Sequence, residues 1–385
     1  MRRTVVELEL AREIVLEYGW NATSYQILNP GISLWFSKTQ RAVIGYIRRN
    51  GVLLVAGAPV CEAKALEVVC EEFESYAEQQ GQRVCYVCAE KRLLLVLAHS
   101  TDHAAVALGA QPAWNPHKWP EILQGRASLR AQLRRAVNKG VVVDTVSAER
   151  AVVDRELRDV LREWLSGRRL PPLHFLAEPN VIGGVLADRM MLVARQRGVP
   201  VAFLVASPAR ARGGYLVELL ARSSSAPNGS GELLIDAAMR RFAEESCEYA
   251  TLGLVALAHA ADEEIRCNPG WLRPLMYFAR AHANRFYNFR GLEQFRMKMS
   301  PERWETIYAI SNERRFSPGT LYAIGSAFSG IPPWAAIGLG IAKAIREELR
   351  AALHRYDAKG FSQTSTGHSS ADLHGNHKLP GDGRR

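Results

Sequence analysis

Residues 215–242, YLVELLARSSSAPNGSGELLIDAAMRRF, combine residue types that can hold an anion. The pattern predicts a strand, a turn-rich loop and a helix, and such a loop presents free backbone N–H groups and the positive end of the helix dipole. Glu218 on the strand and Arg222 near its end bring a carboxylate and a guanidinium toward the loop. The loop is longer than a standard Gly-rich pyrophosphate loop and contains Pro227, so a plain strand-to-helix connection stays open.

A second segment, GRASLRAQLRRAVNKG at residues 125–140, predicts a helix whose charged residues are all basic. Arg126, Arg130 and Arg134 are four apart, so they lie on one face of that helix. A row of guanidiniums matches phosphate groups and stays charged at every physiological pH. The sequence supports two interpretations of this helix face about equally: it binds phosphate groups, or it is an ordinary solvent-exposed face.

Aromatic and basic residues are dense in a third segment, residues 285–310, RFYNFRGLEQFRMKMSPERWETIYAI. Such segments can stack bases or clamp phosphates. Most aromatic residues in a buried segment belong to the core, so this segment taken alone favours a packing role.

The signatures of nucleotide hydrolysis, serine hydrolysis and zinc proteolysis are absent from the sequence. Cys85 and Cys88 lie in a predicted buried strand, where residues three apart point to opposite faces, so we expect packing rather than a shared metal. His368, His374 and His377 lie in a polar tail without fixed geometry. We therefore expect no metal and no cofactor.

Hydrophobic periodicity predicts two α+β units that share an order of strands, helix, strand and helix. The first contains strands over 33–60, a helix over 62–80, a strand over 83–89 and the basic helix. The second contains a helix over 147–165, a hairpin over 189–207, a strand over 213–221, a helix over 232–246 and strands over 249–258 and 304–310. The predicted organisation is an N-terminal helix at 1–20, domains at 21–146 and 147–316, a C-terminal helical segment at 317–356 and a disordered tail at 357–385.

Composition and charge limit the classes of protein and partner. With 48% hydrophobic and 23% charged residues, the chain is globular rather than collagen-like or largely disordered. Lys and Arg number 49 against 39 Asp and Glu, a net charge of +10, which favours an anionic partner such as RNA or acidic lipid. No secretory signal or bilayer-spanning apolar run is present, so we expect a cytoplasmic location. An amphipathic helix over 331–350 is expected either to touch the inner face of the membrane peripherally or to pack on the body.

Four segments together resemble the C-terminal catalytic domain of the phosphatidylglycerol lysyltransferase and alanyltransferase family. They are SLRAQLRRAVNKGV, ELLARSSSAPNGSGELLI, YATLGLVALA and FYNFRGLEQFRMKMSPERWETIYAI, which agree in order and spacing, and the likeness runs from about residue 31 to 310. The resemblance implies an α/β fold of tandem duplicated GNAT-like (acetyltransferase-like) domains with mixed sheets. It also implies transfer of an amino acid of the Lys or Ala class from aminoacyl-tRNA to the hydroxyl of phosphatidylglycerol or a related anionic lipid, without a coenzyme A donor. The family's flippase region is missing from this sequence, so we expect the synthase activity alone.

The resemblance also assigns individual residues. The family's essential lysine matches Lys298, and its acidic strand residue matches Glu218. The family's arginine three positions later falls at Ala221, and Arg222 is one place late.

An aminoacyl ester is already activated, so the enzyme mainly has to hold donor and acceptor and stabilise the oxyanion. We expect Lys298 to hydrogen-bond the oxyanion or the transferred carbonyl, and Glu218 to receive the acceptor's proton or bind the α-ammonium group. Phosphate contacts are expected from Arg222 and the N–H groups around Asn228 and Gly229, and contacts to the tRNA acceptor stem from the row of arginines. The other predicted substrate-binding residues are Glu232, Tyr287 and Asn138.

Three alternatives stay open. The same fold could aminoacylate a peptide, a sterol-like lipid or a small metabolite. It could be an acyl-CoA N-acyltransferase, or a binder of RNA or anionic membrane without catalysis. No DNA partner is expected.

Overall fold

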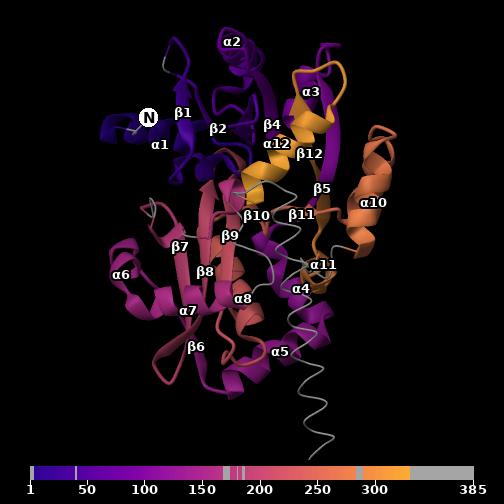
Figure 1. Ribbon diagram of the computed structural model, residues 1–385. Helices are drawn as coiled ribbons and strands as arrows, with labels where there is room; N and C mark the ends of the chain where they lie inside the picture. Colours follow the sequence, from indigo (N-terminus) through magenta and orange to yellow (C-terminus); the bar gives the residue numbers. More distant parts are fainter. Residues whose placement is uncertain are drawn as a thin grey trace, which may run out of the picture. The chain divides into compact units, whose positions relative to one another are not determined.

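In the computed structural model, the described residues are 4–39, 41–167, 174–179, 181–183, 187–282 and 289–329. Tyr287, the predicted helix over 331–350 and the tail lie outside these ranges. The description below concerns the described residues alone (Figure 1).

The first half of the chain alternates strands with helices, as the periodicity predicts. A capping box at Thr4 starts the first helix, and Asn50 and Gly51, both with positive φ, form the predicted hairpin turn. The elements are α1 (Val5–Tyr18), η1 (Ser24–Leu28), β1 (Ser33–Phe36), β2 (Val43–Arg49), β3 (Val52–Ala56), η2 (Ala63–Ala65), α2 (Leu66–Glu78), β4 (Arg83–Ala89), α3 (Lys91–Leu97), β5 (Ala104–Trp114), η3 (Pro116–Lys118), α4 (Trp119–Gly125) and α5 (Ala127–Asn138).

The second half repeats this alternation and ends with further helices. Its elements are β6 (Val141–Thr145), α6 (Ala148–Val153), α7 (Arg155–Ser166), η4 (Phe175–Ala177), η5 (Val181–Gly183), β7 (Met190–Gln196), β8 (Val199–Ala209), η6 (Arg210–Arg212), β9 (Gly214–Arg222), α8 (Ser230–Glu244), β10 (Tyr249–Thr251), β11 (Val255–Ala256), η7 (His259–Ala261), α9 (Asp262–Arg266), α10 (Leu272–His282), α11 (Phe289–Lys298), β12 (Arg303–Ser311) and α12 (Pro318–Ser329).

One mixed sheet joins the two halves, in the order β1-β2-β3-β4-β12-β5-β10-β9-β8-β7-β6. In the first half, β2 and β3 pair antiparallel and α2 crosses over to β4, which is parallel to β3. In the second half, β8 and β9 pair antiparallel and α8 crosses over to β10, which is parallel to β9. This confirms the predicted mixed α/β fold with a repeated order of elements.

The two halves also exchange strands. β5, from the first half, pairs antiparallel with β10, whereas β12, from the second half, pairs antiparallel with β4 and β5. The exchange makes the sheet continuous across the predicted boundary near residue 147, and the division into two domains stays a prediction.

Helices cover both faces of the sheet, which explains the long apolar runs of the central strands. In the first half, α2 and α3 pack on one face and α1, η1 and α12 on the other. In the second half, α4, α5 and α8 pack on one face and α6 and α7 on the other.

Three local predictions differ from the structure. The helix predicted over 147–165 is two helices, because Asp154 interrupts the first and caps the second by accepting hydrogen bonds from the N–H groups of Glu156 and Leu157. The strand predicted over 249–258 is split into β10 and β11, with a left-handed Gly253 between them.

The third difference concerns the two cysteines of β4. Cys85 and Cys88 are buried as predicted, but both side chains lie in the same hydrophobic cluster rather than on opposite faces. Cys88 has a φ of 62°, and the register between β4 and β12 shifts at this point, so a bulge reverses the alternation of side chains. Burial raises the pKa of the Cys88 thiol to about 12, which makes it unreactive.

Candidate active site and the inter-strand cavity

Lys298 and Glu232 form an ion pair that joins two of the predicted segments. Lys298 ends α11 and Glu232 lies in the first turn of α8, and the Lys298 Nζ donates a hydrogen bond of 2.6 Å to Glu232 Oε1. The side chains expose 28% and 11% of their surfaces, so the pair is shielded but open to solvent on the lysine side. An oriented ammonium in such a setting can donate to an oxygen that develops negative charge.

The loop before α8 is held against the basic helix α5. Gly229, the N-cap of α8, has a φ of +96°, and a Cβ built on it would lie 2.2 Å from the backbone oxygen of Gln132 in α5. Glycine is therefore required for this close approach. Asn228 is exposed beside it, so the predicted loop and the predicted basic helix meet at this point.

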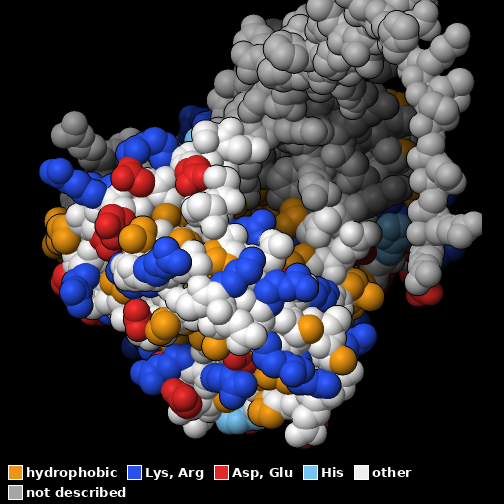
Figure 2. Space-filling view, turned by 90° about the horizontal axis from the view of Figure 1, so that it is seen from below, with side chains coloured by type: hydrophobic (Ala, Val, Ile, Leu, Met, Phe, Trp, Pro, Cys, Tyr) orange, Lys and Arg blue, Asp and Glu red, His pale blue; other side chains and the backbone are white. Residues whose placement is uncertain are grey.

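The basic residues of α5 differ in their exposure and in their hydrogen bonds. The helix begins at Ala127, one residue later than the row of arginines requires, so Arg126 is its exposed N-cap. The guanidinium of Arg130 donates 2.6 Å to the carbonyl of Leu123 and so caps α4. Arg134 and Asn138 are exposed. Seen from below, Lys and Arg side chains are spread over the face that carries α5 (Figure 2).

Glu218 lies at a bulge in the middle of β9. Strand β8 pairs Val205 with Leu219 and Ala206 with Val217, which leaves Glu218 as the extra residue. Its carboxylate is ion-paired with Arg189 and accepts a hydrogen bond of 3.2 Å from Gln26 Nε2. The Glu218 side chain is only 1% exposed.

Arg189, the partner of Glu218, is itself held from several sides. Its Nη2 donates 2.6 Å to Asn29 Oδ1, and its guanidinium lies 4.9 Å from the ring centre of Tyr25. The Tyr25 hydroxyl donates 2.7 Å to Asp188, which also accepts two hydrogen bonds of 2.6 Å from Arg12. Burial opposes ionisation of Asp188, but these hydrogen bonds outweigh it, so its pKa is lowered.

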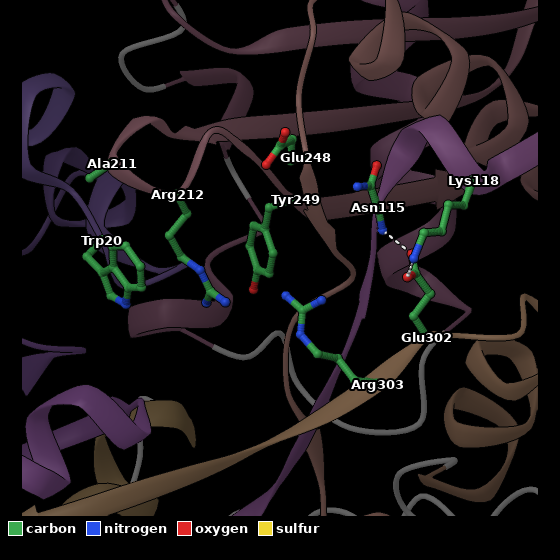
Figure 3. Close-up of a pocket in the computed structure, with 9 residues that line it drawn as sticks. All are labelled: Trp20, Asn115, Lys118, Ala211, Arg212, Glu248, Tyr249, Glu302 and Arg303. Carbon is green, nitrogen blue, oxygen red and sulfur yellow. Dashed lines mark hydrogen bonds and ion pairs between the residues drawn. The ribbon is translucent and has the colours of Figure 1, made fainter.

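A cavity of about 530 Å³ lies where η3, η6 and the starts of β10 and β12 meet (Figure 3). Aromatic and guanidinium groups alternate along it: Arg212 lies 3.7 Å from the ring centre of Tyr249 and 5.4 Å from that of Trp20, and Arg303 lies 5.9 Å from Tyr249. At its edge, Lys118 Nζ donates 2.8 Å to Glu302.

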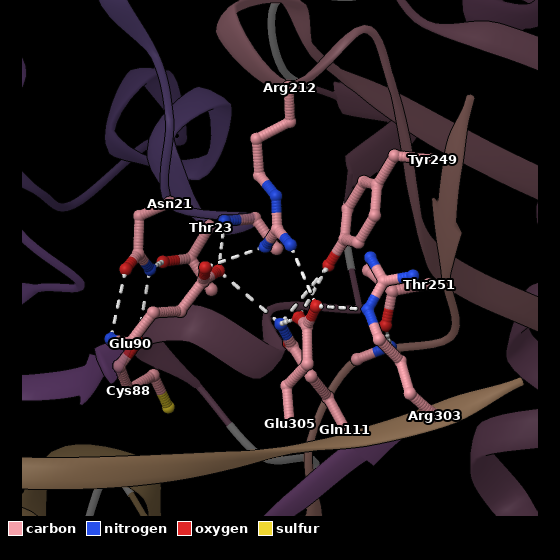
Figure 4. Close-up of polar contacts among 12 residues, drawn as sticks. Asn21, Thr23, Cys88, Glu90, Gln111, Arg212, Tyr249, Thr251, Arg303 and Glu305 are labelled. Carbon is pink, nitrogen blue, oxygen red and sulfur yellow. Dashed lines mark hydrogen bonds and ion pairs between the residues drawn. The ribbon is translucent and has the colours of Figure 1, made fainter. Parts of the chain in front are cut away.

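Behind this cavity lies a buried polar network that joins the two halves (Figure 4). Arg212 Nη1 donates 2.6 Å to Glu90, which follows β4, and Arg212 Nη2 donates 2.8 Å to Glu305 of β12. Gln111 of β5 donates to both carboxylates, at 3.3 and 3.1 Å. Burial raises the pKa of Glu90 against the opposing charge of Arg212, whereas for Glu305 the bonds from Arg212 outweigh burial and lower the pKa. The two pKa values shift in opposite directions because Glu90 is more deeply buried than Glu305, although both carboxylates are ion-paired with Arg212.

The structure brings together some of the residues predicted from sequence and separates others. Lys298 pairs with Glu232 rather than with Glu218, and Arg222 is exposed at the end of β9.

Arg189 and Arg212 were not predicted from the sequence as residues of the site. Arg189 directly precedes the apolar run MMLVA, which predicts a buried strand. Because a buried arginine is almost always paired, its position is a signal in the sequence for a carboxylate partner.

The sequence matches the family model described as "Phosphatidylglycerol lysyltransferase, C-terminal" over residues 12–311. The chain belongs to this family. Known relatives include the phosphatidylglycerol lysyltransferase of Staphylococcus epidermidis, 22% identical over 313 residues, and that of Bacillus subtilis, 23% identical over 311 residues. These matches cover 79% and 80% of this chain but 36% and 35% of the relatives, so the chain spans about a third of their length.

Solved members support the fold. A C-terminal domain (DUF2156) from Agrobacterium fabrum superposes with a TM-score of 0.68 at 21% identity, covering 84% of this chain and 97% of that one. The L-PGS structure from Bacillus licheniformis superposes with a TM-score of 0.67 at 23% identity, covering 83% of this chain and 95% of that one.

Among the described residues of the present chain, no helix has the length and apolar character to cross a bilayer, and no group of three potential metal ligands is found.

Proposed function

We propose that this protein is an aminoacyltransferase that moves an amino acid from aminoacyl-tRNA onto the hydroxyl of phosphatidylglycerol. The observation that carries the proposal is the Lys298–Glu232 ion pair, which joins two of the segments by which the sequence resembles the family. Membership of the family and the curated names of its relatives support the lipid acceptor.

In the proposed reaction the lipid hydroxyl oxygen attacks the ester carbonyl, and the carbonyl oxygen becomes negatively charged. The bond between the carbonyl carbon and the tRNA ribose oxygen then breaks, and the ribose oxygen takes up the proton that the lipid hydroxyl has lost. Lys298 donates a hydrogen bond to the oxyanion, and Glu232 keeps its ammonium aimed at that point. The Glu218 side chain is 1% exposed and already ion-paired with Arg189, so its direct contact with the acceptor's proton or with the α-ammonium group requires this pair to open.

The tRNA is proposed to lie along α5. Arg126 and Arg134 are exposed there, the helix contains no acidic residue, and the backbone of Gln132 contacts the loop that begins α8. Phosphate contacts on this surface therefore place the acceptor end beside the start of the helix that carries Glu232. Such contacts weaken with increasing salt.

A transfer assay tests the proposal, with purified protein, phosphatidylglycerol vesicles and a panel of radiolabelled aminoacyl-tRNAs. We expect label from one tRNA to move into the lipid fraction, and none with phosphatidylcholine vesicles. Label that stays on tRNA throughout, despite tRNA binding, would contradict the lipid acceptor and favour a soluble acceptor.

A further inference from the structure

The cavity beside Tyr249 takes no part in the proposed reaction, yet two charged side chains that line it are open to a ligand. Arg303 is 49% exposed, and its Nε donates 3.0 Å to Glu305, which leaves both Nη atoms without an acceptor among the described residues. Glu248 is exposed, and its carboxylate forms no ion pair with any described residue. The cavity therefore offers one guanidinium edge and one carboxylate.

These open groups border the same space from different sides. The Arg303 guanidinium reaches the space on one side of the Tyr249 ring, and Glu248 lies on the other side of that ring (Figure 3). Asn115 lies across from Tyr249, and its Oδ1 accepts a hydrogen bond of 3.0 Å from the N–H of His117. The Asn115 Nδ2 is therefore the amide group that can donate to a ligand.

The other charges in and behind the cavity are already paired, so net charge does not select an anion. Lys118 lies 2.8 Å from Glu302, and Arg212 is ion-paired with Glu90 and Glu305 at 2.6 and 2.8 Å. An anion alone would be repelled by the open carboxylate, and a cation alone would leave the open guanidinium and amide without an acceptor. A ligand that carries both charges satisfies all three groups.

We propose that this cavity binds a small zwitterion, with its carboxylate on Arg303 and its ammonium on Glu248. A guanidinium binds a carboxylate with two parallel hydrogen bonds, and an ammonium has three N–H donors for a carboxylate. A free amino acid and a short peptide share this chemistry, and a volume of about 530 Å³ lies within the ~300–1,000 Å³ of small-ligand sites. An amino acid esterified to tRNA has no carboxylate, so the proposal does not depend on the proposed reaction.

Isothermal titration calorimetry with the full chain tests the ligand class. The probes are alanine, alanyl-alanine, N-acetyl-alanyl-alanine, which lacks the ammonium, and alanyl-alaninamide, which lacks the carboxylate. We expect millimolar or tighter binding of alanine or alanyl-alanine, the tighter of the two identifying the source, and about tenfold or more weaker binding of each blocked peptide than of alanyl-alanine. No binding of either zwitterion overturns the proposal, and so does a blocked peptide that binds as tightly as alanyl-alanine.

Variants of the same chain test the location. We expect Arg303→Gln and Glu248→Gln each to weaken binding of the zwitterion about tenfold. Arg241→Gln and Glu244→Gln are matched controls, since these residues form an ion pair of 3.1 Å on α8 with 50% and 63% of their side chains exposed, and they should bind within about twofold of wild type. Wild-type affinity in either cavity variant, or an equal loss in the controls, overturns the site. Circular dichroism melting curves check that all four variants are folded.

Discussion

Replacing Gly229 by alanine should separate the loop before α8 from the basic helix α5. At a φ of +96° an alanine is strained by about 1–2 kcal/mol. Its Cβ would also stand 2.2 Å from the Gln132 oxygen, and because both groups belong to backbone, the loop or α5 has to move. Forced repacking of this kind costs about 1–3 kcal/mol. The free energy of unfolding should therefore fall by about 2–5 kcal/mol.

Gly213→Ala provides the matched control. Gly213 also has a positive φ, +62°, but a Cβ there would meet nothing within 4 Å, so only the backbone cost of about 1–2 kcal/mol applies. Urea unfolding of both variants measures the difference. Equal destabilisation of the two would refute the close approach of the loop to α5, and with it the proposed continuity between the tRNA face and the start of α8.

Three further predictions concern the network and the thiols. Arg212→Ala leaves Glu90 buried without its cation, and we expect a loss of about 3–5 kcal/mol in unfolding free energy by urea titration. Glu313, outside that network, follows β12, accepts hydrogen bonds of 2.6 Å from Ser311 and Thr320 and is ion-paired with Arg83. The pKa values of Glu305 and Glu313 are lowered in the folded state, because hydrogen bonds outweigh burial, so their stabilisation is present above about pH 5 and is lost as pH falls through about 4 toward the lowered values. Thermal melts at pH 3.5 and 6 should show it, and a Glu313→Gln variant should show a smaller difference. Of the six cysteines only Cys267 is exposed, so a thiol reagent should label one thiol quickly in the native protein and all six after unfolding.

Much of the fold could be predicted because hydrophobic periodicity and turn residues are local signals. The Asn50-Gly51 and Arg197-Gly198 turns, for example, define the hairpins β2–β3 and β7–β8. The exchange of β5 and β12 could not be predicted in this way. Both are apolar strands, and which neighbour each chooses depends on contacts between residues far apart in sequence, such as Arg303 and Ala113.

The candidate site was predictable to the extent that its residues lie in recognisable segments. The segments containing Lys298 and Glu232 could be identified from sequence, but not that these two side chains pair, since 66 positions separate them. Likewise, the alternation in YLVELLA places Glu218 on the strand but does not show the bulge. Arg189 was missed because its carboxylate partner lies on a different strand.

The most direct test compares Lys298→Ala with Lys64→Ala in the lipid-transfer assay. Lys64 is also a lysine in an ion pair, 3.0 Å from Glu62, but it is 81% exposed and far from the proposed chemistry in the sequence. If Lys298 stabilises the oxyanion, its removal should lower kcat by about 10²- to 10³-fold in a protein that melting curves show to be folded at the assay temperature, and Lys64→Ala should keep wild-type turnover. Wild-type turnover by Lys298→Ala would contradict the assignment of Lys298 to the reaction.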